Sequence, residues 1–415
     1  MKRGRKLHYA WVAFGCCIAL KLGVAGVVGC LSGNFVTPVV RDLGCPVSQF
    51  TLFVSVEAAA MALMYTTASK VLTTRRIGLV MGTASAVQAA AIALMATYRS
   101  AVMFSVSGAF LGLASAFTGF VAIPLVINMW FREKVGMVLG LIMAAGNVAT
   151  VGYSLLSGRL IDRFGWRSAY LILAAIAFII TVPAAFLLLK SPEELHCEPY
   201  GKSVSRREET LEQGLTRSQA VRRPVFYVVW FVCILYSVSN GVAGYIATFS
   251  TMELGQSIAF GARASMCVQL GCIGCSAVLG YVNDRFGVQA GLIWGTVFSC
   301  AGYFVMLASF KQPTMVLAAA LLVGLGGSMY TVQSPLLVRD VLGSRDYPSI
   351  WALIMMGNSL AGAFSYSPIG LFYDIGGSYR GAFICAIVLF LLALCLGFLA
   401  GAHKRHLQDF CRQAD

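Results

Sequence analysis

Two charged side chains stand inside long apolar runs, and their types suit the binding of a charged substrate. Lys21 lies in the middle of CCIALKLGVAGVVGCLSG, residues 16–33, and Glu57 lies in FVSVEAAAMALM, residues 53–64. An ammonium group can hold an anionic group of a ligand, and a carboxyl group can carry a proton. If these runs cross a bilayer, each charge costs about 2.5–3.5 kcal/mol and marks a pathway or a pairing site.

The elements that position these charges are long apolar segments. The chain has 415 residues, of which 58% are hydrophobic and 12% charged, whereas soluble domains carry roughly a quarter charged residues. A helix needs about 20 mostly apolar residues to cross a bilayer. Such runs occur at 10–38, 47–69, 77–97, 101–129, 135–157, 167–189, 224–252, 258–282, 288–309, 314–337, 347–371 and 380–402. The sequence therefore predicts an all-α membrane protein with twelve transmembrane helices.

The positive charge of the chain follows from this topology. A net charge of +14 would suggest nucleic-acid binding in a soluble protein, but most of the 31 Lys and Arg residues lie at the termini and in the even-numbered loops. The positive-inside rule then places both termini in the cytoplasm and makes a nucleic-acid partner unnecessary. The first apolar run is too long for the core of a signal peptide, so we expect a retained helix. We see no targeting segment, which leads us to expect a bacterial inner membrane.

One long polar segment, residues 190–223, divides the chain into two halves of six spans. We predict a six-helix bundle over 1–189, a cytoplasmic linker over 190–223 that is partly helical around 206–220, and a second six-helix bundle over 224–415 with a short cytoplasmic tail. Asp42-Leu43-Gly44 recurs 211 residues later as Glu253-Leu254-Gly255. A repeat of six spans means two bundles in parallel orientation. Transporters that work by alternating access are built this way, with the substrate near the midplane.

Lys21 and Glu57 are expected at similar depths. At 1.5 Å rise per residue each lies roughly 15–17 Å from the face where its helix starts, near the middle of the bilayer. Three interpretations stay open: Lys21 binds an anion while Glu57 carries a coupling proton, the two form a static ion pair, or Lys21 extends toward water. Ser32 is expected on the same helix face as Lys21, whereas Asn34 is expected on the far side.

Neutral polar residues inside other spans are further candidates for the walls of a cavity. They are Asn147, Tyr236, Asn240, Gln269, Tyr330, Gln333 and Asn358. Each of them serves equally well as a hydrogen-bonding group between helices.

Several motifs carry a family resemblance. GYVNDRFG at 280–287 resembles the loop motif of the major facilitator superfamily, which implies that Asp284 and Arg285 form a gating latch on the cytoplasmic side. The matching stretch of the first half, SKVLTTRRIG at 69–78, has Thr73 in place of the aspartate. The resemblance covers nearly the whole chain and implies two pseudo-symmetric six-helix bundles, the major facilitator fold.

Within that superfamily the chain resembles the branch of oxalate–formate antiporters and monocarboxylate porters. The similar stretches are MWFREKVGMVLGLIMAAGNVA at 129–149, DRFGWRSAY at 162–170 and LEQGLTRSQAVRRPVFYVVW at 211–230. The branch implies a carboxylate substrate held by cations. This sequence departs from it: the positions of those cations fall near Asn34 and Ser276, and no Lys or Arg lies between Pro348 and Pro368.

These observations predict a secondary active transporter for a small organic anion, most simply a monocarboxylate, coupled to a proton or exchanged for another anion. The sequence contains no GxxxxGK[ST] loop and no HExxH motif, and most of its 13 cysteines lie in the spans. We therefore expect no cofactor, no metal and no enzymatic activity. One alternative is a proton-coupled exporter of neutral or hydrophobic compounds. Another is a membrane sensor that does not transport.

Overall fold

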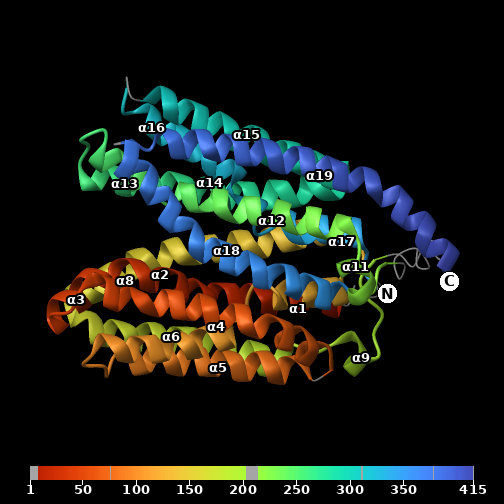
Figure 1. Ribbon diagram of the computed structural model, residues 1–415. Coiled ribbons are helices and arrows are strands. Elements are labelled where there is room, and N and C mark those ends of the chain that lie inside the picture. Colours follow the sequence, from red (N-terminus) through yellow and green to blue (C-terminus); the bar gives the residue numbers. More distant parts are fainter. Residues whose placement is uncertain (1–7, 75, 202–213, 310–311, 377, 415) are drawn as a thin grey trace, which may run out of the picture. The chain divides into compact units, whose positions relative to one another are not determined.

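The chain forms two separate helical units. The computed structural model describes residues 8–74, 76–201, 214–309, 312–376 and 378–414, and only the backbone at 32–33, 47–48, 74, 258–259, 362–376 and 403–414. The units are Met1–Lys202 and Ser203–Asp415 (Figure 1). Their boundary falls inside the polar segment 190–223.

The helices of the N-terminal unit fit the first six predicted spans. They are α1 (Tyr9–Leu20), the π-helical turn η1 (Lys21–Ala25), α2 (Gly26–Asn34), α3 (Val36–Leu43), α4 (Val47–Thr74), α5 (Ile77–Met95), α6 (Ala101–Ser115), α7 (Ala122–Trp130), α8 (Val135–Pro183), the π-helical turn η2 (Ala184–Leu188) and α9 (Pro192–Leu195). The long α8 contains two predicted spans. They meet at Gly165, whose φ of 77° interrupts the helix because only glycine adopts that backbone conformation readily.

The helices of the C-terminal unit fit the other six spans. They are α11 (Arg217–Val221), α12 (Pro224–Ala243), α13 (Ile246–Met252), α14 (Ile258–Phe286), α15 (Val288–Ala308), α16 (Met315–Gly326), the 3₁₀ turn η4 (Gly327–Met329), α17 (Gln333–Leu342), α18 (Tyr347–Gly376) and α19 (Arg380–Ala414). In both units the fourth span is broken, as α6 with α7 and as α16 with α17.

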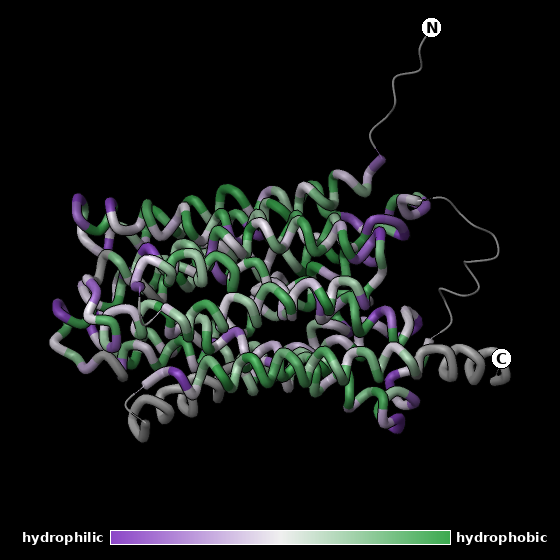
Figure 2. Tube along the Cα trace, turned by 90° about the horizontal axis from the view of Figure 1, so that it is seen from above, coloured by the Kyte–Doolittle hydropathy of each residue, from purple (hydrophilic) through white to green (hydrophobic). Residues whose placement is uncertain are grey.

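Length and hydropathy identify the units as membrane domains. Among the described residues, nine helices are long and apolar enough to cross a bilayer, and α8 counts as one of them although it covers two predicted spans. Hydrophobic residues run along the middle of the helices, and hydrophilic residues gather at their ends (Figure 2). The prediction of an all-helical membrane protein is confirmed for the described part of the chain.

Both ends of the polar segment 190–223 are docked on the units. In the N-terminal unit, the Arg132 amide donates to the Tyr200 carbonyl (3.0 Å) and the Tyr200 amide to the Trp130 carbonyl (2.8 Å). In the C-terminal unit, the Leu215 amide donates to the Leu342 carbonyl (3.1 Å). The two docking loops, after α7 and after α17, are equivalent in the repeat. Of the expected helix around 206–220, α11 covers the end, and residues 202–213 lie outside the described part.

At the opposite end of each unit a carboxylate fastens the first span to the sixth. Asp42 accepts from Trp166 Nε1 (3.2 Å) and from Arg167 Nη1 (2.8 Å). Its counterpart in the repeat, Glu253, accepts from the Ser378 hydroxyl and from the Tyr379 amide (2.9 Å). The Asp42–Arg167 pair is nearly half exposed, so its net contribution is about 0–1 kcal/mol. These carboxylates define the geometry of the turns that they join more than they stabilise the fold.

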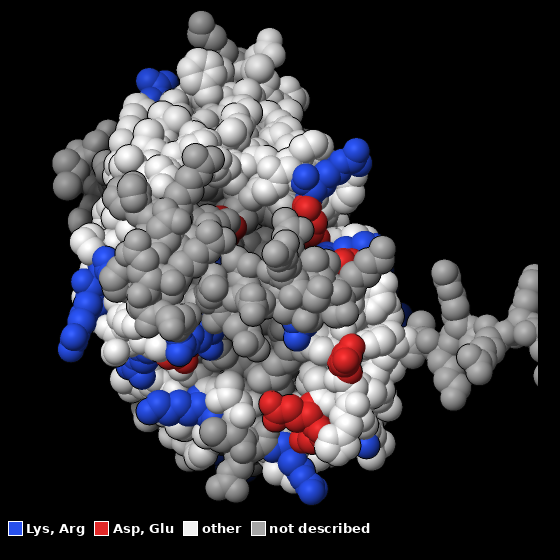
Figure 3. Space-filling view, turned by 90° about the vertical axis from the view of Figure 1, so that its right-hand side faces the viewer, with Lys and Arg blue, Asp and Glu red and all other residues white. Residues whose placement is uncertain are grey.

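In each unit, the end of the helices at which the polar segment 190–223 docks carries basic side chains. Figure 3 shows Lys and Arg side chains on this face, with Asp and Glu side chains among them. Exposed examples are Arg76, Lys134 and Arg345 in the loops after α4, α7 and α17, and Arg285 in the last turn of α14. Their placement at one end of the helices matches the charge asymmetry that the sequence predicted.

Glycines bring neighbouring helices into contact, as the pairing of α4 with α6 illustrates. A Cβ atom at Gly112 on α6 would collide with the carbonyl oxygen of Glu57 and lie 2.9 Å from the Cβ atom of Ala60. At Gly152 on α8, by contrast, a Cβ atom would meet nothing within 4 Å. Van der Waals packing through such small residues drives helix association in a bilayer.

This contrast gives a first prediction. Gly112→Ala should destabilise the detergent-solubilised protein by about 1–3 kcal/mol because the methyl group forces α6 away from α4. Gly152→Ala, the matched control in an open helical position, should be neutral or stabilising by up to about 1 kcal/mol. Thermal unfolding of the full chain measures both. Equal effects of the two substitutions would contradict the close contact of α6 with α4.

Candidate functional site

Lys21 is buried at a break in the first span. The α-helix α1 ends at Leu20, and the wider π-helical turn η1 begins at Lys21. Single π-turns within α-helices often mark functional sites. Only 7% of Lys21 is exposed, and its Nζ atom lies 4.5 Å from the centroid of the Phe120 ring, in the turn between α6 and α7. The ammonium group therefore rests on an aromatic face at cation–π distance.

The backbone of α8 makes room for this side chain. A Cβ atom at Gly146 would lie only 3.1 Å from Cδ of Lys21. On the other side of η1, a Cβ atom at Gly26 would lie 2.6 Å from the Cβ atom of Ala149. Glycines on both helices thus let the aliphatic stem of Lys21 lie against α8. Asn147 follows Gly146 directly and is half-buried without a hydrogen bond to the described residues.

The described residues supply no counter-ion to Lys21. Its recorded contact is the Phe120 ring, and no hydrogen bond or ion pair within the described part of the chain reaches its ammonium group. A lysine ammonium has three N–H donors and no acceptor. The π face of one phenyl ring cannot satisfy all three donors, so the site has unused capacity for an acceptor.

Glu57 does not neutralise Lys21. The two do not form an ion pair in the described structure, although their depths in the sequence allowed one. The reason lies in the helix pairing: α4, which carries Glu57, packs chiefly on α6, whereas η1, which carries Lys21, packs chiefly on α8. The carboxylate of Glu57 is half-buried and makes no hydrogen bond to the described residues.

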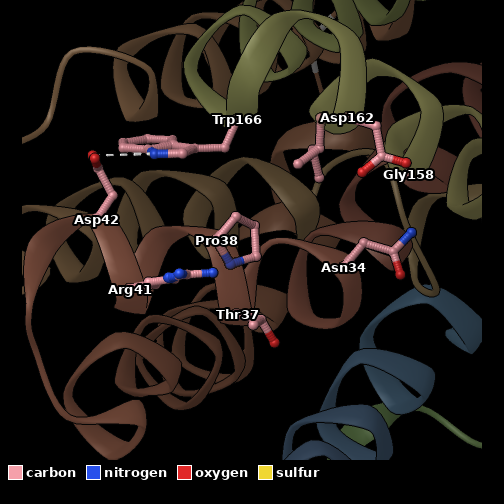
Figure 4. Close-up of a pocket in the computed structure, with 9 residues that line it drawn as sticks. Asn34, Thr37, Pro38, Arg41, Asp42, Gly158, Asp162 and Trp166 are labelled. Atoms are coloured by element: carbon pink, nitrogen blue, oxygen red, sulfur yellow. Dashed lines mark hydrogen bonds between the residues drawn. The ribbon is translucent and has the colours of Figure 1, made fainter.

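A pocket at the end of the N-terminal unit that carries Asp42 was not predicted. It has a volume of about 870 Å³ and is lined by Asn34, Thr37, Pro38, Arg41, Asp42, Gly158, Ile161, Asp162 and Trp166 (Figure 4). The Asn34 amide donates to the Ser154 carbonyl (2.5 Å) and to the Ser157 hydroxyl (2.9 Å). The spacing of residues 34, 37, 38 and 41 marks one helix face and is a signal that could have revealed the pocket. The side chain of Ser32, expected near Lys21, lies outside the described residues.

Three of the polar candidates in the C-terminal unit meet at one small cavity. Tyr236 and Asn240 on α12 and Tyr330, just after η4, line a space of about 20 Å³. Tyr236 is 1% exposed, and its hydroxyl has no partner among the described residues. This volume excludes an organic substrate and admits something the size of a water molecule.

Gln333 and Asn358 serve contacts between helices. Gln333 accepts from Asn283 Nδ2 (2.8 Å) and donates to the Val288 carbonyl (2.8 Å), so it joins α17 to α14 and α15. The backbone carbonyl of Asn358 accepts from the Ser237 hydroxyl on α12 (3.2 Å). Gln269 on α14 is half-buried and makes no hydrogen bond within the described part of the chain.

The predicted latch residues lie at the basic end of α14. Arg285 donates to the Tyr281 hydroxyl (2.6 Å), and Asp284 is within electrostatic range of Arg339 on α17. In the first half, the Thr73 hydroxyl donates to the Ser69 carbonyl of its own helix (3.0 Å). The two halves therefore differ at this motif in structure as well as in sequence.

Comparisons with known proteins identify the family. A family model described as Major Facilitator Superfamily matches residues 18–279 and 253–409. The chain belongs to this superfamily. Because the two matches together cover most of the chain, the family applies to both units.

The chain aligns with part of the length of several curated relatives. The chain is 22% identical over 234 residues to an uncharacterized MFS-type transporter, YhjX, of Escherichia coli, and covers 55% of it. It is 30% identical over 159 residues to the multidrug resistance protein MdtH of Cronobacter sakazakii, and covers 36% of it. It is 26% identical over 191 residues to the dipeptide and tripeptide permease B of Yersinia enterocolitica, and covers 38% of it. The alignments thus span about half or less of each relative, and 55%, 38% and 44% of this chain, respectively.

Solved structures show the same fold over nearly the whole chain. A bacterial homologue of the iron transporter ferroportin in an outward-facing state superposes with a TM-score of 0.71 at 14% identity, covering 95% of this chain and 100% of that one. The superfamily transporter FucP in its outward conformation gives 0.71 at 13% identity, covering 95% and 99%. At this identity the likeness establishes the major facilitator fold alone.

A second prediction separates structural from ligand-binding glutamines. Gln333→Met should destabilise this superfamily member, since it removes the acceptor for Asn283 and the donor for Val288, at about 1–3 kcal/mol for each buried group left unpaired. Gln269→Met, the control on α14, should change stability by less than about 0.5 kcal/mol. Thermal unfolding measures both. A Gln333 variant as stable as the Gln269 variant would remove the structural role.

Proposed function

We propose that the protein is a secondary transporter that moves a small organic anion, with monocarboxylates as the first class, by alternating access between its two units. Membership of the Major Facilitator Superfamily supports transport. An anion is proposed as the substrate because the ammonium group of Lys21 lies on the Phe120 ring and has no ionic partner among the described residues. Transport changes the location of the substrate and not its covalent structure.

The electrostatics of Lys21 favour a carboxylate ligand. A charge near the middle of a span costs about 2.5–3.5 kcal/mol, and a desolvated cation–π contact returns about 2 kcal/mol. The cation–π contact supplies no hydrogen-bond acceptor for the three N–H groups of Lys21. A bound carboxylate provides acceptor oxygens and a neutralising charge at once, and the Phe120 ring offers an apolar surface to the organic part of a small monocarboxylate.

The separation of Glu57 from Lys21 supports a coupling role for Glu57. A carboxylate held in an ion pair resists protonation because the cation stabilises its charged form. Glu57 has no such partner among the described residues, so it can take up a proton without first breaking a contact. We assign the coupling proton to Glu57. If Glu57 keeps one protonation state throughout transport, the alternative is that the substrate is exchanged for a second anion.

The finer assignments follow from the same observations. The motifs at 129–149, 162–170 and 211–230 support the branch of oxalate–formate antiporters and monocarboxylate porters. The basic loops support cytoplasmic termini, and the bacterial relatives support an inner-membrane location. Asp284 and Arg285 are assigned to the gating latch of the C-terminal unit.

A second candidate is proton-coupled export of neutral or hydrophobic compounds. The observation that favours it is the neutral character of the polar candidates on the helices of the C-terminal unit, such as Asn240 and Gln269. The stretch of 159 residues that is 30% identical to a multidrug resistance protein points the same way. This candidate assigns Lys21 a purely structural role, so the two proposals make opposite predictions for that residue.

A third prediction tests the anion site at Lys21. The purified full chain should be stabilised by a small carboxylate such as formate, acetate, lactate or oxalate, by about 2.7 kcal/mol at 100 times its dissociation constant. Lys21→Met should lose this stabilisation because the ammonium that pairs with the carboxylate is gone. Thermal unfolding across the panel, with neutral and hydrophobic compounds alongside, measures the response.

The matched control is Arg263→Met. Arg263 also lies over a phenylalanine ring, at 5.5 Å from the Phe260 centroid, but it is exposed. This variant should respond to carboxylates as the wild type does. A Lys21→Met protein that melts cooperatively and still responds to carboxylates would refute the anion site, and stabilisation by neutral compounds alone would favour the exporter.

A fourth prediction concerns coupling. In proteoliposomes, a pH gradient should drive carboxylate uptake by the wild type, and Glu57→Gln should abolish this drive while exchange of labelled for unlabelled substrate continues, because glutamine cannot carry the proton. Glu194→Gln, an exposed carboxylate on α9 outside the spans, should behave as the wild type. Full gradient-driven uptake by the Glu57 variant would show that the proton travels elsewhere.

A further inference from the structure

The small cavity of the C-terminal unit is a narrow chamber of distinctive composition. It occupies about 20 Å³ between α12, α14, α15, α16 and α19. Tyr236 and Ser239 reach it from α12, and Ser299 and Tyr303 reach it from α15. All four side chains are at most 1% exposed. Hydroxyl groups from two helices are thus gathered at one small cavity inside the bundle.

Three of these hydroxyls have no partner in the described structure. The Tyr236 hydroxyl, Ser239 Oγ and Ser299 Oγ are fully buried without a hydrogen bond, whereas the Tyr303 hydroxyl donates to the Ser239 carbonyl (3.3 Å). Leaving a buried hydroxyl unpaired costs about 1–3 kcal/mol. Three such groups around one cavity would be a large penalty for a single unit unless a common partner satisfies them.

The backbone is shaped to keep this space open. A Cβ atom at Gly326 on α16 would collide with Ser299 Oγ. Any side chain at that position would therefore push the hydroxyl out of the chamber. Glycine at 326 keeps α16 close to α15 and leaves the Ser299 hydroxyl facing the cavity.

The size and chemistry of the chamber select its ligand. To hold a water molecule, a cavity needs roughly 10–15 Å³ of space that the centre of the molecule can occupy, and a buried water typically makes about three hydrogen bonds. No carboxylate lines the chamber, so a metal cation would be buried without a compensating charge at a large cost. We infer that the chamber binds one ordered water molecule that bridges the hydroxyls of Tyr236, Ser239 and Ser299.

This water would join α12 to α15 inside the C-terminal unit. Direct hydrogen bonds between these hydroxyls are not formed, so the bridge supplies the polar contact that the side chains do not make with one another. It would also hold the Tyr236 hydroxyl in one orientation beside Asn240 and Tyr330, which line the same cavity. The inference stands whether or not the protein transports an anion.

Substitution of serine distinguishes a wet chamber from a dry one by the sign of the effect. If a water is bound, Ser299→Ala removes one of its partners and should lower the unfolding temperature of the full chain by at least about 2 °C, the shift for a loss near 1 kcal/mol. If the chamber is dry, the same substitution removes an unpaired hydroxyl and should leave the temperature unchanged or raise it. Ser239→Ala should follow Ser299→Ala. The control is Ser250→Ala, a buried serine that donates to the Ile246 carbonyl (2.8 Å) away from the chamber.

X-ray radiolytic labelling provides a direct readout. Hydroxyl radicals formed from a bound water label the side chain beside it, so buried Tyr236 should be oxidised. Tyr347, which is also buried but whose hydroxyl donates to the Pro335 carbonyl (3.4 Å), should not. Labelling of Tyr236 should fall in the Ser239→Ala/Ser299→Ala double variant. Absence of labelling at Tyr236 together with unchanged stability of Ser299→Ala would overturn the inference. So would stabilisation by sodium at constant ionic strength, which would assign the chamber to a cation.

Discussion

The close approach of the first span to α8 is the contact on which the candidate site depends. In a bilayer, helices gain little from the hydrophobic effect when they associate, so they hold together through van der Waals packing between small residues. Gly23, Gly26 and Gly29 present such a surface to α8, and Gly146 presents one in return. This contact leaves the stem of Lys21 buried between helices and away from lipid. Larger side chains at this contact would separate the helices and let the ammonium group reach water along the helix surface.

Buried polar groups in this protein fall into two kinds, and the difference is informative. Asn283 donates to Gln333 and Gln333 donates to the Val288 carbonyl, so these amides link three helices, which is the ordinary use of amides inside a membrane. Lys21 and Glu57 have no such arrangement within the described residues. A charge costs more to bury than an amide, and a fold that needed only stability would have paired these two. Their separation is consistent with partners that come and go.

The helical architecture could be predicted because each span is a long apolar run with its own internal hydrogen bonds. The places of Lys21 and Glu57 inside long helical spans also followed from the sequence. The sequence did not show which helices are in contact. Helix α4 packs on α6 because Gly112 leaves room for the backbone of α4, and this fit depends on the surfaces of both helices. The π-helical turn at Lys21 has no sequence signature here. The sequence pattern of one helix also could not show whether Gln333 contacts a ligand or Asn283.

Duplication kept the framework of the two units and changed their chemistry. Gly44 and Gly255, equivalent in the repeat, have the same φ of 62°, and the carboxylates two residues before them fasten the same pair of spans. The positions equivalent to Lys21 and Glu57, however, are Val232 and Val268. The C-terminal unit places neutral hydroxyls near its centre where the N-terminal unit places charges. A charge must be compensated, whereas a hydroxyl needs only a hydrogen bond, so the proposed anion site lies in the first unit. The second unit is left with neutral polar contacts.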